Sequence, residues 1–503
     1  MSRTKSAFLG IISSQLYAVI LILISLFSVP IIIKHLNSEL YGLSIIIFQI
    51  TTYLGLFDFG LTVGVERYLA GTRDDTGANK EGLKRIISTS LIAYTFLAAV
   101  IMIVGNIFAP FAVSLFNAPM KYSSGIQSII SIISVLIGLQ LILRAIGGIF
   151  FAHQRQLLSN TLSFVLNLCS VCLTILFVCF GYGLWSFAYS QIITFVINAV
   201  LNIYFFKKYY SYIEFKVQYF DRGLLKELIS YGFSSFIMVF SVQIIFQTDR
   251  ILIGYFISLT AVSIYSLSTK IPELLTQFLW KITDNSFPAI VEVSNKDAES
   301  FMGIHNKLMT ITISLSTVTF WYILLASHSF ISLWVGEKYY AGFFFIFIAT
   351  YLYLIQHTFI HVSAMCLSAA GMAKKMAFMY LLEAVLNLTL SILLIKHFQL
   401  AGVIFGTIIS GLLTTVWYIP YLLIKYSQSN IFVYLSSIVK PVFIVSIVDI
   451  VLYELLKVKF YNINNWLTLI LYSALFLLVS LIPILLLNRV LIRSLKIKFS
   501  VNN

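Results

Sequence analysis

Long runs of apolar residues, separated by short polar segments, follow one another along almost the whole chain. Each run has about 20 residues or more, the length of helix that crosses a bilayer core of about 30 Å. The sequence lacks the alternating short segments of an outer-membrane barrel, so we expect the runs to be helices. The pattern therefore predicts an all-α integral membrane protein.

The polar breaks divide the chain into fourteen predicted transmembrane helices. We expect them at 7–33, 40–66, 86–116, 125–152, 157–180, 184–206, 226–257, 259–285, 307–334, 341–370, 375–395, 400–424, 431–456 and 465–487. The first run is too long for the apolar region of a cleaved signal peptide, so it is interpreted as the first span.

Composition and charge support this interpretation. The chain is 60% hydrophobic and 10% charged, whereas soluble domains are about 45–50% apolar and about 25% charged. Most of the 33 lysines and arginines fall in segments on one side of the predicted layout. By the positive-inside rule that side is cytoplasmic, which places both termini there. The net charge of +14 thus follows from topology, and nucleic-acid binding is not needed to explain it.

The tetrapeptide VLNL occurs twice, in "FVLNLCS" (164–170) and in "AVLNLTL" (384–390), each time after a short basic turn. The two copies also fall at corresponding helices of the predicted layout. This predicts a duplication of six helices, with both copies in the same orientation around an axis along the membrane normal. We expect two pseudo-symmetric lobes around a central cavity. The predicted parts are an N-lobe (1–206), a cytoplasmic linker (207–227), a C-lobe (228–424), and helices 13–14 with a basic cytoplasmic tail (425–503).

A charged stripe follows the predicted helix 259–285. Its members, Lys270, Glu273, Gln277, Lys281 and Asp284, are spaced by three or four residues and share one helical face. Ionisable side chains in a span are costly in lipid and by default mark a functional site or a specific pair. We therefore expect the stripe to face protein or water.

Four cations are predicted within the spans: Arg144, Arg250, Lys270 and Lys281. A ladder of cations across the membrane suits an anionic group such as pyrophosphate. The alternative is that each cation only pairs with a nearby acid and fixes the packing. The candidate partners, which are also candidate gating or ion-coupling residues, are Asp58, Asp249, Glu273 and Asp284.

Asp58 interrupts the apolar stretch "LGLFDFGLTVGVERYLAG" (54–71). We expect it in the inner half of the helix 40–66, as a gate or as a partner for Arg144. Glu66 is expected where this helix meets water. Gly60 and Gly64, four residues apart, predict close approach of a neighbouring helix.

Further residues bear on coupling and cofactors. Glu383, on the predicted helix 375–395, is a candidate for proton or sodium coupling. His357 and His361 lack the glutamate of a metalloprotease helix, so no metal site is predicted. No P-loop and no long outer loop are present, which argues against a built-in ATPase and against a glycan-assembling enzyme.

The chain resembles lipid-linked oligosaccharide flippases of the polysaccharide transport family, within the multidrug/oligosaccharidyl-lipid/polysaccharide exporter superfamily. The resemblance rests on "LYGLSIIIFQITTYLGLFDFGLTVGVERYLA" (40–70), "TDRILIGYFISLTAVSIYSLSTKI" (248–271) and "LLEAVLNLTLSILLIKHFQLAGVIFGTIIS" (381–410). It implies alternating access and no covalent chemistry. The implied substrate is an undecaprenyl-pyrophosphate-linked repeat unit for surface polysaccharide, such as O-antigen of lipopolysaccharide or capsule, carried across the bacterial cytoplasmic (inner) membrane.

Two other functions remain open at this point. A multidrug exporter of the same superfamily would bind cationic drugs and would favour acidic residues in its cavity. A membrane enzyme of glycan assembly would need an outer loop that carries acid–base residues. The expected partners are the lipid-linked oligosaccharide, the bilayer and other polysaccharide-assembly proteins, with a monomeric chain, no nucleic acid and no cofactor beyond H+ or Na+.

Overall fold

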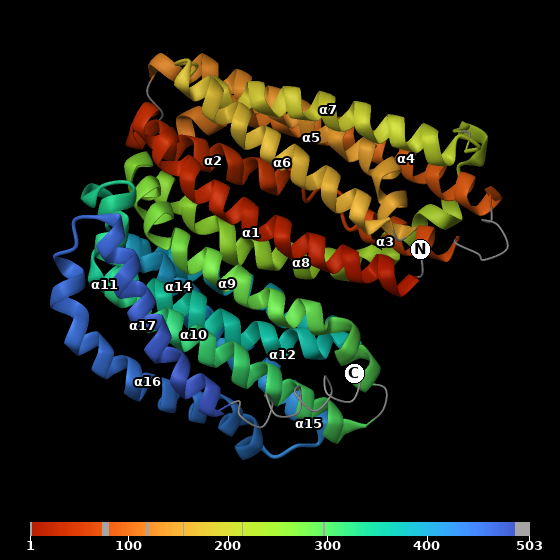
Figure 1. Cartoon of the computed structure of the whole chain (residues 1–503). Helices are drawn as coiled ribbons and strands as arrows, with labels where there is room; N and C mark the ends of the chain where they lie inside the picture. Colours follow the sequence, from red (N-terminus) through yellow and green to blue (C-terminus); the bar gives the residue numbers. More distant parts are fainter. Residues whose placement is uncertain are drawn as a thin grey trace. The chain divides into compact units, whose positions relative to one another are not determined.

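The computed structural model describes residues 3–72, 80–116, 120–153, 155–213, 215–294 and 297–487 of the 503-residue chain. This described part consists of helices and short connections, and it contains no β-strand (Figure 1). The predicted all-α fold is confirmed. The basic tail expected at the C-terminus follows Leu487 and lies outside the described residues.

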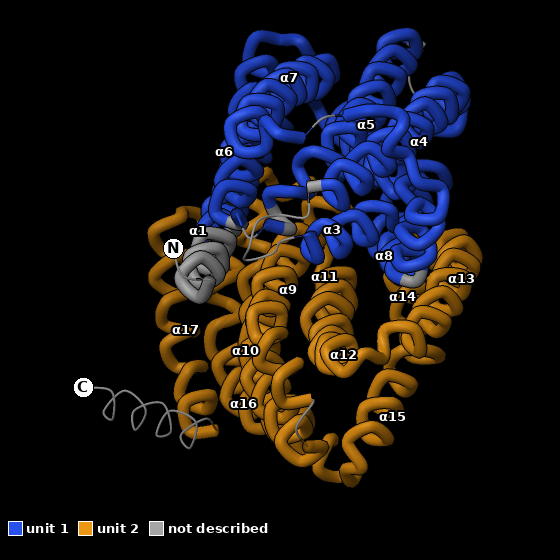
Figure 2. The backbone as a smooth tube through the Cα atoms, turned by 90° about the vertical axis from the view of Figure 1, so that its right-hand side faces the viewer, with its two compact units in different colours: residues 1–263 blue, residues 264–503 orange. Residues whose placement is uncertain are grey.

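The chain forms two compact units, residues 1–263 and 264–503 (Figure 2). Unit 1 contains α1 (Arg3–His35), α2 (Ser38–Leu54), α3 (Leu61–Gly71), α4 (Lys80–Leu115), η1 (Met120–Tyr122), α5 (Ser123–Ala152), α6 (Gln156–Cys179), α7 (Trp185–Tyr210), η2 (Val217–Tyr219) and α8 (Arg222–Phe256). Helix α9 (Leu259–Ser294) begins in unit 1 and continues into unit 2. Unit 2 then contains α10 (Ala298–Trp334), η3 (Glu337–Tyr339), α11 (Phe343–Thr350), the π-helix η4 (Tyr351–His357), α12 (Thr358–Ala369), α13 (Ala373–Phe398), α14 (Leu400–Leu413), α15 (Thr415–Ser427), α16 (Ile431–Tyr461) and α17 (Trp466–Leu487).

Every predicted transmembrane segment overlaps a helix or a group of consecutive helices. Within the described residues, eleven helical segments are long and apolar enough to cross a membrane, and a shorter apolar helix covers Val19–His35. Helix α9, which carries the charged stripe, is not among the eleven. The protein is therefore a multi-pass membrane protein, and the count of fourteen spans stays a prediction.

Helix α8 belongs to unit 1 because it packs against α2 and α3. The repeat-based division assigns the same helix to the second lobe. The two divisions describe different things, since the units are defined by packing and the lobes by sequence repetition. The predicted boundaries at 206, 227 and 424 stay predictions.

The predicted continuous helix 40–66 is wrong, because the chain turns between α2 and α3. Phe59 and Gly60 have φ values of 49° and 79°, in the left-handed region that an α-helix cannot accommodate. The Asp58 carboxylate accepts a hydrogen bond from the Gly60 backbone N–H at 3.0 Å, the local bonding that favours aspartate in turns. Asp58 thus lies in the turn and not within a helix.

The predicted close approach at Gly60 and Gly64 is confirmed, and the neighbour is α8. A Cβ on Gly60 would lie 2.3 Å from the carbonyl oxygen of Gly232. A Cβ on Gly64 would lie 2.2 Å from the carbonyl oxygen of Leu228. Only glycine allows the backbones of α3 and α8 to come this close.

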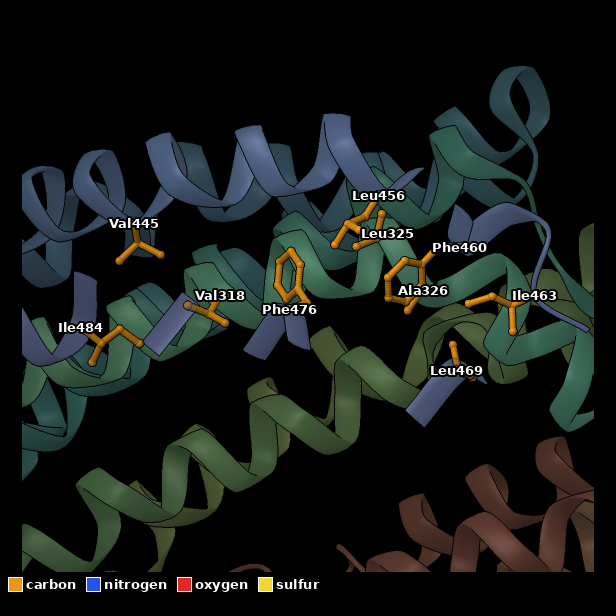
Figure 3. Packing of buried hydrophobic residues seen from close by; sticks show 10 residues of the cluster. All are labelled: Val318, Leu325, Ala326, Val445, Leu456, Phe460, Ile463, Leu469, Phe476 and Ile484. Atoms are coloured by element: carbon orange, nitrogen blue, oxygen red, sulfur yellow. The ribbon is translucent and has the colours of Figure 1, made fainter. Parts of the chain in front are cut away.

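The two C-terminal helices pack onto unit 2. Helices α16 and α17 both lie against α10, and the buried side chains between them form one hydrophobic cluster (Figure 3). Phe460 and Phe476 are fully buried in this cluster. Burial of an aromatic side chain of this size stabilises the fold by about 1.5–3 kcal/mol, so these helices are an integral part of the unit.

Candidate functional site

A polar cavity of about 360 Å³ lies within unit 1, between α3, α5, α6 and α7. The residues around it are Thr62, Glu66, Gln140, Leu143, Arg144, Gly147, Gly148, Phe150, Ser159, Leu162, Ser163, Leu166, Asn198 and Asn202. Its volume is in the range of small-molecule sites, about 300–1,000 Å³. Eight of these fourteen residues have a polar or charged side chain, in a chain that is 60% hydrophobic.

Among the described residues, Arg144 on α5 is the one cation that lines this cavity. Its Nη1 lies 3.5 Å from Oδ2 of Asp58, so the structure brings together the two residues that the sequence suggested as a pair. The Arg144 side chain is 44% exposed and that of Asp58 is 14% exposed. The guanidinium therefore keeps donors available for a second anionic partner.

Glu66, which is predicted to lie where the helix meets water, belongs to α3, which begins at Leu61 and packs against α5. Glu66 is half-buried and lines the cavity, and its Cγ is 3.7 Å from where a Cβ on Gly148 would lie. Its neighbour Arg67 is exposed and stacks at 3.9 Å over the ring of Tyr231. One arginine thus shares the site with two carboxylates.

Amide and hydroxyl groups complete the cavity. The Asn202 side-chain amide donates to Oδ1 of Asn198 at 2.6 Å, one turn earlier on α7. Gln140 lies one turn before Arg144 on α5, and Ser159 and Ser163 line the wall from α6. These residues are not predicted from the sequence. Their signal is polar side chains four residues apart on otherwise apolar helices.

The other candidates of unit 1, Asp249 and Arg250, lie on α8, away from the cavity. Both are buried, and neither lines the cavity. The Arg250 guanidinium donates from Nη1 to the Gln247 side-chain oxygen at 3.3 Å and to the Phe246 carbonyl at 3.4 Å. Arg250 is therefore held by its own helix as well as by its surroundings.

The charged stripe on α9 lies in unit 2, where its four charged members are half-buried and Gln277 is exposed. Glu273 accepts hydrogen bonds from the Thr269 hydroxyl at 2.9 Å and from the Tyr353 hydroxyl at 3.1 Å. Lys270 and Lys281 are also half-buried. The stripe thus faces protein along part of its length, as predicted.

Asp284 pairs with α12 and not with its own helix. Its Oδ1 lies 2.9 Å from Nε2 of His361, whose ring stacks on Trp280 at 4.3 Å. The alternative of a local pair with Lys281 is therefore wrong for Asp284. Among the described residues of unit 2, Lys281 forms no ion pair.

Glu383 on α13 is almost fully buried, at 3% exposure. It accepts a hydrogen bond on Oε2 from Thr414, at 3.3 Å, and it lies near Gly411 on α14. One turn further along α13, Asn387 donates to the Thr407 hydroxyl at 2.8 Å. This second polar cluster belongs to unit 2 alone. In the part of the chain that the structure describes, no group of three histidine, cysteine or acidic side chains is placed to bind a metal ion.

The structure thus separates the candidates into three groups. Asp58 and Arg144 meet at the cavity of unit 1, and Glu66 joins them. The stripe of α9 and the cluster around Glu383 lie in unit 2. The proposed ladder of four cations draws on both units and stays a prediction.

An all-helical, multi-pass chain with polar sites inside its bundles is characteristic of membrane proteins that handle polar solutes. Comparison with known proteins defines it further. Residues 8–294 match the model of the family described as polysaccharide biosynthesis protein. Since the match covers more than half of the chain, this protein belongs to that family.

The chain is also similar to three individual proteins, one by sequence and two by structure. The chain is 23% identical over 438 residues to an uncharacterized membrane protein, EpsK, of Bacillus subtilis (strain 168), covering 85% of each. It is similar to the lipid II flippase MurJ in an inward closed conformation, with a TM-score of 0.68, 14% identity and coverage of 97% of this chain and 99% of MurJ. It is also similar to an inward-facing multidrug resistance transporter of the MATE family, with a TM-score of 0.62, 14% identity and coverage of 82% and 96%. The protein therefore shares its fold with MurJ and with the MATE-family transporter.

Proposed function

We propose that this protein is a flippase that moves undecaprenyl-pyrophosphate-linked oligosaccharide repeat units from the cytoplasmic to the outer leaflet, for the synthesis of surface polysaccharide such as O-antigen or capsule. It acts by alternating access and without covalent chemistry. The family description and the MurJ-like fold support this proposal. We place it in the bacterial cytoplasmic membrane as a monomer with both termini inside, next to other polysaccharide-assembly proteins.

The observation that carries the proposal is the cavity around Arg144. A guanidinium presents a planar fork of donors that fits phosphate oxygens. The amides of Gln140, Asn198 and Asn202 both donate and accept, as sugar hydroxyls do. An oligosaccharide diphosphate needs both kinds of group in one place. In this proposal Lys270, Lys281 and Arg250 serve the same anion at other stages of transport, and Glu383 couples transport to H+ or Na+.

Deletion of the gene tests the proposal. The expected result is loss of surface polysaccharide and accumulation of lipid-linked repeat units inside the cell, since synthesis continues while transport stops. Complementation with the intact chain restores both. Normal surface polysaccharide in the deletion strain, with no accumulation, contradicts the proposal.

Export of cationic drugs is a second candidate, and one observation favours it. Glu66 lines the cavity and Asp58 contacts its arginine, so two carboxylates lie near one cation, and the MATE-family structure has the same fold. Drug susceptibility of the deletion strain separates the two functions. A strain with several-fold lower resistance to lipophilic cations and normal polysaccharide would identify an exporter.

A further inference from the structure

A second pocket, of about 500 Å³, lies within unit 2 where the end of α10, the η3 connection and the end of α16 meet. By the predicted orientation this end of the unit faces the outer leaflet. The residues that matter for its chemistry are His328, Glu337, Tyr340, Tyr453, Lys457 and Tyr461. None of them takes part in the sites described above.

Aromatic rings dominate the polar part of this pocket. The His328 ring stacks on Tyr461 at 4.3 Å and meets Tyr340 edge-to-face at 5.1 Å, and Tyr453 adds a third phenol. Nδ1 of His328 is buried without a hydrogen-bond partner among the described residues. The faces of such rings attract cations, as in the aromatic cages that bind quaternary ammonium groups.

The charges at the pocket have both signs. The Glu337 side chain is 76% exposed, and its Oε1 is 3.6 Å from Nε2 of His328, too far for a hydrogen bond. Both of its oxygens are therefore free to accept from a ligand. On the other side Lys457 lines the pocket and pairs with Glu454 on the same helix. The pocket lining thus offers one carboxylate, Glu337, and one cation, Lys457, which is already paired, and this combination suits a zwitterion.

The remaining wall is apolar and includes exposed side chains. Leu324 and Leu325 are buried at the floor, while Phe343 and Val458 are exposed. An amphipathic ligand fits this combination, because its polar part meets the charges and its apolar part meets the wall. A free saccharide has no apolar part for that wall.

We propose that this pocket binds the headgroup of a zwitterionic phospholipid in the outer leaflet. The ammonium group lies between the tyrosine rings and Glu337, and the phosphate faces Lys457. This site goes beyond the proposed transport function and does not depend on it. It gives unit 2 a fixed lipid contact at one end of α10.

Native mass spectrometry of the purified full-length chain tests the site directly. The protein is offered phosphatidylethanolamine, phosphatidylcholine or phosphatidylglycerol with identical acyl chains. We expect the two zwitterionic lipids to be retained about tenfold better than phosphatidylglycerol. Equal retention of all three, which annular lipid would give, overturns the proposal.

Variants locate the binding. Glu337→Gln and Tyr461→Leu are each expected to remove most of the headgroup selectivity, whereas Glu299→Gln, at the exposed opposite end of α10, leaves it unchanged. Unchanged selectivity in both pocket variants overturns the proposal. Competition by maltotetraose for the retained lipid also overturns it, since that result would identify a saccharide site.

Discussion

At the scale of single residues, we expect the contact between Arg144 and Asp58 to matter more for binding than for folding. The two groups are 3.5 Å apart and the arginine is 44% exposed. An ion pair in such a setting contributes only about 0–1 kcal/mol to stability. The geometry leaves the guanidinium available to exchange Asp58 for a phosphate group.

Arg144→Gln is therefore expected to abolish transport of the lipid-linked repeat unit while the melting temperature stays near that of the wild type. Arg144→Lys keeps the charge but loses the fork of donors, so it is expected to retain part of the activity. Surface polysaccharide in the complemented deletion strain is the measurement. Lys121→Gln, an exposed residue outside the cavity, is the matched control. Full activity of Arg144→Gln at normal expression would remove this residue from the mechanism.

Gly64 tests the packing of α3 on α8. Gly64→Ala places a methyl group against the Leu228 carbonyl oxygen, so we expect a loss of about 1–3 kcal/mol in the free energy of unfolding, as for overpacked cores. Thermal unfolding of the detergent-solubilised protein measures this loss. Gly71→Ala, with no atom within 4 Å of the new methyl group, should leave stability unchanged or slightly raised. Equal stability of the two variants would refute the close approach.

At the scale of elements, helix α8 depends on its first turn. Asp221 is the N-cap, and its Oδ1 accepts from the Leu224 backbone N–H at 3.0 Å. Its Oδ2 pairs with Arg85 of α4 at 2.7 Å. The Leu224 N–H lowers the pKa of the Asp221 carboxyl, and the Gly223 N–H and Arg85 lower it further.

A lowered pKa in the folded state means that ionised Asp221 stabilises the fold above the ordinary aspartate value of about 3.9, and that this contribution is lost as pH falls below it. Asp221→Asn keeps the cap but not the charge. We expect its melting temperature to be below that of the wild type at neutral pH, with a gap that closes below about pH 4. Asp221→Ala, which also loses the cap, should stay below both. A gap that is independent of pH would contradict the charge assignment.

The pair α13–α14 carries the proposed coupling site. Glu383 is buried with the Thr414 hydroxyl as a partner, and a buried carboxylate of this kind is favoured when it holds a proton or a cation. Glu383→Gln keeps the shape of the side chain but cannot take up and release a proton or bind a cation by its charge. We expect it to fold normally and to lose the dependence of transport on an H+ or Na+ gradient, measured in vesicles. Glu299→Gln is the control, and gradient-dependent transport by Glu383→Gln would exclude the coupling role.

Hydrophobic patterning locates the helices well, but it does not locate the breaks within them. The fourteen predicted segments all coincide with helices, because apolar length is a direct consequence of the membrane. The turn at Asp58 was missed because the residues around it remain apolar, and the break at Thr414 was missed for the same reason. Both depend on backbone torsion angles, which hydropathy does not encode.

At the scale of the whole molecule, the sequence is enough to predict the class of protein. It predicts only some of the residues that make up its sites. Arg144 and Asp58 were found because charge within an apolar run is conspicuous. Asn198 and Asn202 were not found, since uncharged amides stand out less than charges in an apolar run. That Glu66 lines the cavity was not predicted, because its position depends on where α3 begins. Which polar residues share a cavity depends on helix rotation, and one sequence does not specify that.

The proposed movement of a lipid-linked oligosaccharide across a bilayer can be measured in liposomes. The most direct measurement uses purified protein in liposomes that contain a fluorescent undecaprenyl-pyrophosphate oligosaccharide, with an impermeant quencher added outside. We expect the wild-type protein to move the fluorescent lipid from the inner leaflet to the outer leaflet, where the quencher reaches it. With Arg144→Gln, the inner-leaflet lipid should stay protected, as in empty liposomes. The same slow rate for wild-type protein and for empty liposomes, under both an H+ and a Na+ gradient, would contradict the account.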